Sequence, residues 1–236
     1  MQRRTEGKHW AVVLAGGEGT RLQELTRQIT GSPIPKQYCR IMGERSMLET
    51  TLIRTQRYVP VDNTLVVINS THLDIAREQL HPLPDGNILV QPCNRDTGPG
   101  LLFGLLALVR RDPAAIVGLF PSDHYVGDDR GFIDHVGHAT RVVEEMPDKI
   151  VVLGIRPDHP EPGYGYIMPA GQYAGWSVSP SRRVRPCVPC REVPRKAAHP
   201  CGPKSSPPGR LVELLCDGFP ASPNAGTHAR CDGRGV

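Results

Sequence analysis

Short apolar runs alternate with segments of helical spacing over the first two thirds of the chain. The runs are rich in Val, Ile and Leu and are bounded by glycine, proline or polar residues, which is typical of buried parallel strands. We predict strands at residues 11–14, 64–68, 87–91, 115–120 and 149–155. Between them, apolar residues recur every three or four positions and predict helices near 47–55, 73–80 and 132–143.

The segment 96–110 is nearly all apolar, which predicts a helix that is buried on most sides. Regular alternation of strand and helix over more than a hundred residues indicates an α/β fold, with a mostly parallel sheet covered by helices on both faces. Ligands bind at the carboxyl ends of the strands in such folds. The loops that follow the strands are therefore the place to look for chemistry.

The loop after the first predicted strand is rich in glycine and reads LAGGEGTRL over residues 14–22. Gly16, Gly17 and Gly19 would let the backbone approach a ligand closely, with N–H groups facing phosphate oxygens. The pattern is neither a P-loop nor the dinucleotide-binding fingerprint. The glycines alone fit an ordinary turn between strand and helix equally well.

Two basic residues favour phosphate binding over a plain turn. Arg21 ends the glycine-rich stretch, and Lys36 lies in a Pro-Lys-Gln motif at 35–37. Together they would supply the positive charge that a triphosphate needs.

A carboxylate follows the predicted strand 115–120, in the sequence Phe-Pro-Ser-Asp-His. Asp123 at the carboxyl end of a strand, beside a phosphate loop, is well placed to hold Mg²⁺. Capping of the next turn explains this aspartate equally well. Further on, the segment 162–167 reads PGYGYI and would line a pocket or form a turn into an edge strand.

Taken together, these motifs resemble the sugar-nucleotide pyrophosphorylases, most closely the mannose-1-phosphate guanylyltransferases. The matching stretches occur in the family's order and are residues 14–22, 35–37, 91–99, 120–124 and 154–167. The resemblance implies a Rossmann-like nucleotidyltransferase domain over residues 8–170, which joins an NTP and a sugar 1-phosphate into an NDP-sugar and pyrophosphate with the help of Mg²⁺. GTP and mannose 1-phosphate are the expected substrates.

The resemblance also implies roles for individual residues. Arg21 and Lys36 would be catalytic, because they neutralise the triphosphate and the departing pyrophosphate. Asp123 would bind Mg²⁺, and Gly165 would lie against the sugar. The implied nucleotide-binding residues are Leu14, Ala15, Gly16, Gly17, Gly19, Thr20, Arg95 and Thr97. The family's Glu-Pro-x-x-Arg-Asn-Thr-Ala motif reads QPCNRDTG at 91–98, which leaves the base preference open.

Residues 171–236 have a different composition from the rest. They hold 10 Lys and Arg against 4 Asp and Glu, whereas residues 1–170 hold 18 against 20. They also carry 10 of the 24 prolines and 5 of the 7 cysteines. We expect a disordered tail that does not belong to the fold. The alternative of a zinc site at Cys187 and Cys190 lacks a second Cys-x-x-Cys pair at finger spacing.

The family's Phe-x-Glu-Lys-Pro and Trp-Asn-Ser motifs, which carry a sugar-phosphate lysine and precede a second metal-binding carboxylate, do not occur in the tail as written. Moving the reading frame forward by one base allows residues 193–197 to read Phe-x-Glu-Lys-Pro and residues 209–217 to read Gly-Gly-Leu-Trp-Asn-Ser-Phe-Val-Met. We therefore infer a frameshift near residues 168–185, so that the nucleotidyltransferase domain is incomplete at its C-terminal side.

These expectations define the hypotheses for the structure. The chain as written would have weak or no activity and would tend to aggregate. A nucleotide-binding remnant without catalysis, and a transferase for another base or sugar, are the alternatives. The polar N-terminus, without the apolar stretch of a signal peptide, favours a cytoplasmic location. No run is long enough for a membrane span, and the basic tail lacks the stacking aromatics of a nucleic-acid site.

Overall fold

The computed structural model describes residues 9–154, 168–169, 190–192 and 210–214. Its strands are β1 His9–Leu14, β2 Thr64–Asn69, β3 Ile88–Gln91, β4 Ile116–Pro121, β5 Val151–Leu153, β6 Met168–Pro169, β7 Cys190–Glu192 and β8 Arg210–Leu214. Its α-helices are α1 Gln23–Thr30, α2 Met47–Thr55, α3 Leu73–Leu80, α4 Thr97–Val109 and α5 Asp129–Glu145. None of the helices within these residues is long and apolar enough to cross a membrane.

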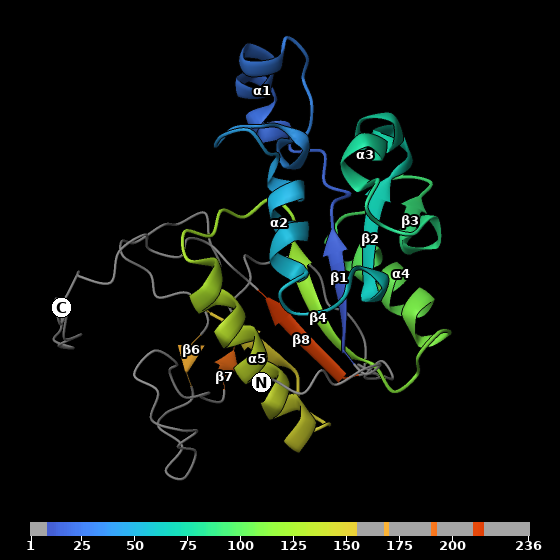
Figure 1. Cartoon of the computed structure of the whole chain (residues 1–236), viewed down its shortest axis with the longest axis vertical. Coiled ribbons are helices and arrows are strands. Elements are labelled where there is room, and N and C mark those ends of the chain that lie inside the picture. Colours follow the sequence, from blue (N-terminus) through green and yellow to red (C-terminus); the bar gives the residue numbers. More distant parts are fainter. Residues whose placement is uncertain (1–8, 155–167, 170–189, 193–209, 215–236) are drawn as a thin grey trace, which may run out of the picture.

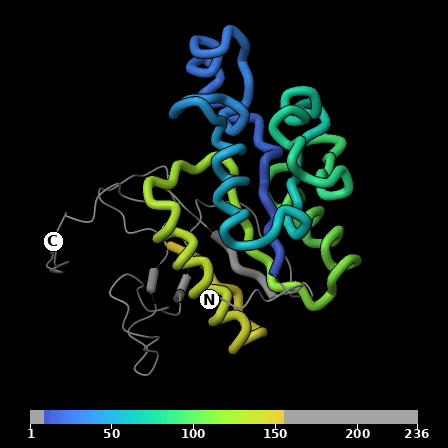
Figure 2. Tube along the Cα trace, in the orientation of Figure 1, coloured from blue at the N-terminus to red at the C-terminus, as the bar shows by residue number. Residues whose placement is uncertain are grey.

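Six strands form one sheet in the order β3-β2-β1-β4-β8-β5 (Figure 1), and every pairing in it is parallel. The α/β class and the parallel sheet expected from the strand–helix alternation are confirmed. Strands β6 and β7 pair separately in an antiparallel fashion. The tube in Figure 2 shows α1 extending beyond the sheet at the end where β1 finishes.

Alternate residues of the central strands enter two different cores, as the two-residue period of a strand requires. Ala11 and Val13 of β1 pack with α2, α3 and α5, in front of the sheet in Figure 1. Val12, between them, packs toward α4 on the opposite face. Strand β2 is buried along its whole length, because helices cover it on both sides.

Helix α4 is more exposed than its apolar sequence predicted. It was expected to be buried on most sides, but Leu102, Phe103 and Leu106 are 50%, 38% and 56% exposed. The side facing the sheet instead carries Gly100, Gly104 and Leu108, one turn apart. An apolar composition alone does not reveal how many sides of a helix find a partner.

The sheet also includes a strand from beyond residue 170. Strand β8 lies between β4 and β5, with Ile116 opposite Arg210 and Leu153 opposite Leu214. A segment from the Arg-, Pro- and Cys-rich tail thus completes the parallel sheet. Apart from β7, the remaining tail, including Cys187, lies outside the described residues.

Candidate functional site

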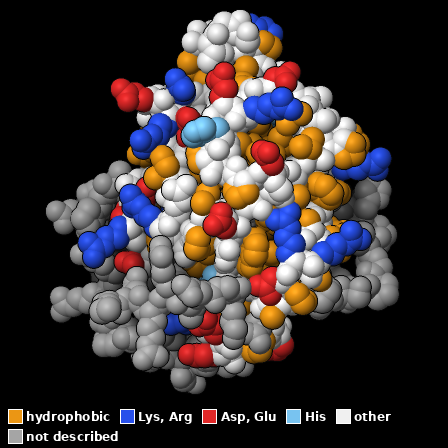
Figure 3. Space-filling model, turned by 45° about the vertical axis from the view of Figure 1, so that its right-hand side comes forward, with side chains coloured by type: hydrophobic (Ala, Val, Ile, Leu, Met, Phe, Trp, Pro, Cys, Tyr) orange, Lys and Arg blue, Asp and Glu red, His pale blue; other side chains and the backbone are white. Residues whose placement is uncertain are grey.

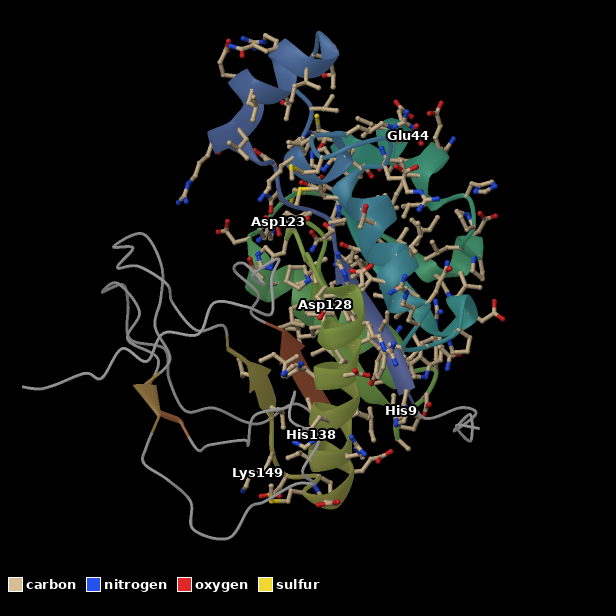
Figure 4. The ribbon with its side chains drawn as sticks, turned by 60° about the vertical axis from the view of Figure 1, so that its left-hand side comes forward. His9, Glu44, Asp123, Asp128, His138 and Lys149 are labelled. Carbon is tan, nitrogen blue, oxygen red and sulfur yellow. The ribbon has the colours of Figure 1, made fainter. Side chains whose placement is uncertain are left out.

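The candidate site is at the carboxyl edge of the parallel strands, where the loops after β1, β3 and β4 meet. Ser122, directly after β4, donates from its hydroxyl to the carbonyl oxygen of Leu14 at 2.7 Å. This bond ties the start of the glycine loop to the loop that carries Asp123. Figure 4 shows Asp123 at this end of the sheet, whereas His138 and Lys149 lie toward the other end.

The three loop glycines differ in how well each position would tolerate a side chain. Gly19 has φ +59°, and a Cβ there would stand 2.9 Å from the Lys36 amide nitrogen, so a side chain would be both strained and crowded. At Gly16 a Cβ would stand 3.1 Å from Oε1 of Gln91. Gly17 has open space around it. The close approach at Gly19 brings Lys36 back to the loop from 17 residues further along the chain.

The predicted basic residues both lie at this loop. Arg21 is exposed in a short 3₁₀ turn, Thr20–Leu22, and Lys36 begins a second one, Lys36–Tyr38. Neither side chain forms an ion pair with another described residue. The proposed role of the two charges, neutralising the phosphates of a nucleotide, stays a prediction.

Leu14 and Ala15, predicted to bind nucleotide, use their backbone groups within the protein. The Leu14 carbonyl accepts from Ser122, and the Ala15 N–H donates to Val67 at 2.8 Å. The Ala15 carbonyl accepts from Gln37 at 3.0 Å and from Tyr38 at 2.9 Å. Leu14 and Ala15 therefore support the loop through hydrogen bonds of their backbone groups.

From the sequence, no role was assigned to Gln37 or Tyr38. Both are buried, and both bond to a loop more than twenty residues away in sequence. The Pro-Lys-Gln motif drew attention to this segment, but a sequence motif does not show which side chains point toward the loop.

The loop from β3 to α4 forms the other wall. The buried side-chain amide of Gln91 lies between Gly16 and Gly100. A Cβ on Gly100 would stand 2.9 Å from Nε2 of Gln91, and a Cβ on Gly16 would stand 3.1 Å from Oε1 of Gln91. Asp96 precedes α4 with φ 66° and ψ −175°, a conformation that a residue other than glycine seldom adopts. The predicted Arg95 and Thr97 flank it and are both exposed.

Asp123 is the predicted metal ligand, and its side chain is 49% exposed. Its Oδ1 lies 3.6 Å from Nε2 of His124. Within the described residues, no three His, Cys, Asp or Glu side chains gather into a metal-binding group. A single carboxylate fits a magnesium ion that arrives with substrate phosphates, since Mg²⁺ is usually held by one or two carboxylates and the phosphates themselves. Gly165, predicted to contact the sugar, lies outside the described residues.

The site is thus a glycine-rich loop with two basic side chains at the edge of a parallel sheet, which is the design of a nucleotide-binding α/β protein. The family model of the nucleotidyl transferases matches residues 10–178. The chain belongs to this family.

Named relatives narrow the comparison. The chain is 34% identical over 161 residues to mannose-1-phosphate guanylyltransferase 2 of Escherichia coli O157:H7, covering 66% of this chain and 32% of the relative. It is 37% identical over 166 residues to mannose-1-phosphate guanylyltransferase ManC of Salmonella typhimurium, covering 68% and 33%. The chain therefore spans about a third of the length of these curated relatives.

A solved structure agrees with this comparison. A protein of Thermus thermophilus, described as a mannose-1-phosphate geranyltransferase, superposes with a TM-score of 0.61 at 31% identity. The match covers 72% of this chain and 48% of the other. The resemblance seen in the sequence motifs is confirmed.

Proposed function

We propose that this chain is the nucleotide-binding part of an enzyme that transfers the nucleotidyl group of GTP to mannose 1-phosphate, releasing pyrophosphate. The observation that carries the proposal is the glycine loop, with Arg21 and Lys36 beside it and no described carboxylate paired to either. The choice of GTP and mannose 1-phosphate rests on the names of the relatives.

The reaction needs little from the protein beyond position and charge. A sugar phosphate oxygen attacks the α-phosphorus in line, the bond from that phosphorus to the bridging oxygen breaks, and pyrophosphate leaves. Negative charge grows on the departing phosphates, where Arg21 and Lys36 stabilise it. The loop N–H groups hold the phosphates in place, which supplies orientation without a protein nucleophile.

A magnesium ion would be held by Asp123 together with the phosphates and would neutralise part of their charge. The half-exposed carboxylate, at the carboxyl end of β4, fits this ion. We propose Asp123 as its protein ligand among the described residues.

Calorimetric titration with Mg-GTP tests the nucleotide half directly. We expect Arg21→Ala and Lys36→Ala each to weaken binding about tenfold or more, since each removes a charge-assisted contact to phosphate. Arg27→Ala is the matched control, because Arg27 is exposed on the nearby α1 and pairs with Glu24 at 3.3 Å. Equal losses in all three variants, or no binding by the wild-type chain, would contradict the proposal.

A non-catalytic nucleotide-binding remnant is the second candidate. It is favoured by the acidic side of the site, since no group of three His, Cys, Asp or Glu side chains that could hold a metal ion is found among the described residues. Pyrophosphate release with GTP and mannose 1-phosphate separates the two, because a remnant binds Mg-GTP but releases none. A panel of other nucleotides and sugar phosphates tests the remaining alternative, a different base or sugar.

The proposed frameshift is tested by resequencing the coding DNA across codons 160–236. One base more or fewer would restore the lysine and Trp-Asn-Ser motifs that the family resemblance implies. An unchanged sequence would leave the tail as a genuine part of this chain.

A further inference from the structure

The glycine loop is held from beneath by two buried side chains. Gln37 donates from Nε2 to the carbonyl oxygens of Ala15 at 3.0 Å and Gly17 at 2.6 Å. Tyr38 donates from its hydroxyl to the same Ala15 carbonyl at 2.9 Å. Gln37 and Tyr38 are only 3% and 2% exposed, so water does not compete for these bonds. We call this pair the carbonyl clamp.

The clamp fixes the direction of two peptide groups. A trans peptide is planar, and its N–H points opposite to its C=O. Because the carbonyls of Ala15 and Gly17 point to the clamp, the N–H groups of Gly16 and Glu18 point away from it. No hydrogen-bond acceptor for either N–H is found among the described residues. Two neighbouring N–H groups with one direction form a concave site for an anion.

The clamp is itself anchored to two helices. The backbone carbonyl of Tyr38 accepts from Nε2 of Gln79 on α3 at 3.1 Å. Ser46, the N-cap of α2, donates to Oε1 of that glutamine at 2.6 Å. His72 packs its ring edgewise on Tyr38, with 5.5 Å between centroids. Burial raises the pKa of Tyr38, so its hydroxyl keeps the proton that it donates.

We propose that Tyr38 and Gln37 are positioning residues for nucleotide binding, which turn the N–H groups of Gly16 and Glu18 toward the phosphates. The assignment of the anion as a nucleotide phosphate rests on the proposed function, whereas the clamp itself rests on the hydrogen bonds. Without the clamp, each of these peptides is free to rotate, and its carbonyl oxygen would repel a phosphate.

Tyr38→Phe removes one clamp donor and keeps the ring. Tyr58→Phe is the matched control, since its partly buried hydroxyl forms a hydrogen bond with Oγ1 of Thr140 at 3.0 Å, in a part of the core away from the loop. Gln37→Glu is a second variant of nearly unchanged shape, in which a carboxylate would face the carbonyls of Ala15 and Gly17 in place of a donor. Melting temperatures identify any variant that loses its fold.

The first readout needs no ligand. We expect amide hydrogen exchange at Ala15 and Leu22, whose N–H groups bond to Val67 and Gly19, to become about threefold to tenfold faster in Tyr38→Phe and Gln37→Glu. In Tyr58→Phe these two amides should exchange as in the wild type. Unchanged exchange in both clamp variants would overturn the proposal, whatever the chain binds.

The second readout is the affinity for Mg-GTP. We expect Tyr38→Phe to weaken it about threefold to tenfold, the effect of one net hydrogen bond, with no change in Tyr58→Phe of similar melting temperature. An equal loss in both variants would show a merely structural effect and overturn the positioning role. Faster exchange in the clamp variants of a chain that binds no GTP would uphold the clamp and refute the proposed function.

Discussion

The two faces of the sheet achieve their packing in opposite ways. On one face, α2, α3 and α5 bury large side chains such as Phe120, Leu48 and Phe132 in one continuous core. On the other, α4 comes so close that a Cβ on Gly104 would stand 2.9 Å from Cγ1 of Val12. The first face gains stability from side-chain volume, and the second from close contact between helix and sheet.

The comparison shows why α4 tolerates its exposed apolar side. Gly100, Gly104 and Leu108 are buried against the sheet, and Leu101 and Leu105 pack partly buried against the same core, so the opposite side of the helix takes no part in this contact. Figure 3 shows apolar side chains between charged ones on one side of the molecule. Substitutions on the two faces should therefore follow different rules.

The largest expected effect is the difference in the free energy of unfolding between alanine substitutions at two phenylalanines. Phe120 is 1% exposed and contacts the rings of Tyr58 and Phe132, so Phe120→Ala should lower the free energy of unfolding by about 3–5 kcal/mol. The same change at Phe103, which is 38% exposed on α4, should cost less than about 1.5 kcal/mol. Urea unfolding of both variants measures the difference, and equal losses would remove the distinction between the faces.

The next effect tests the close approach of α4. Gly104→Val should lower the free energy of unfolding by about 1–3 kcal/mol, because the side chain has to displace Val12 and Val67. Gly137→Val on α5 is the control, since a Cβ there meets nothing within 4 Å. A Gly104 variant as stable as the control would show that the helix shifts outward without penalty.

Acid should weaken the three-helix face. Burial lowers the pKa of His138 on α5, with Arg141 and His135 acting in the same direction and Glu145 in the opposite one. The unfolded chain then binds more protons below pH about 6.5, so stability should fall as the pH drops through the window beneath that value. Thermal melts from pH 7.5 to 5.5 should show a shallower decline in His138→Gln than in the wild type. The exposed His81→Gln serves as control, and an identical slope in all three chains would refute this source of acid sensitivity.

The smallest effect concerns the outer side of α4. Leu106 is 56% exposed, so Leu106→Lys should change the free energy of unfolding by no more than about 0.5 kcal/mol. The same replacement at Leu108, which is 1% exposed and faces the sheet, should prevent stable folding. Light scattering should also fall in the Leu106 variant if this side contributes to aggregation.

Much of the fold could be predicted from local pattern. Five strands and four helices were expected close to their observed bounds, because a period of two or of 3.6 residues is visible within a single segment. The pattern gave no prediction for α1, whose Leu25 and Ile29 remain 41% and 46% exposed. Such a helix lacks the buried stripe on which this reasoning depends.

The candidate site also has features that local sequence predicts and features that it does not. The glycine loop, Arg21, Lys36 and Asp123 could be proposed from the sequence because loops after parallel strands meet at one edge of the sheet. Gln37 and Tyr38 were not assigned a role, and Leu14 and Ala15 have backbone groups occupied within the protein. Hydrogen bonds between segments more than twenty residues apart leave no local periodicity to read.

The sequence by itself determined the order of most strands and helices, the glycine-rich loop at the end of β1 and the family motifs, all of which depend on neighbouring residues. Only the tertiary structure decided that β8 enters the sheet between β4 and β5, that α4 exposes one apolar side, and that Gln37 and Tyr38 bond to carbonyls of the loop. Each of these depends on which distant segment occupies a given space, and that is settled by packing and by the need of buried polar groups for partners.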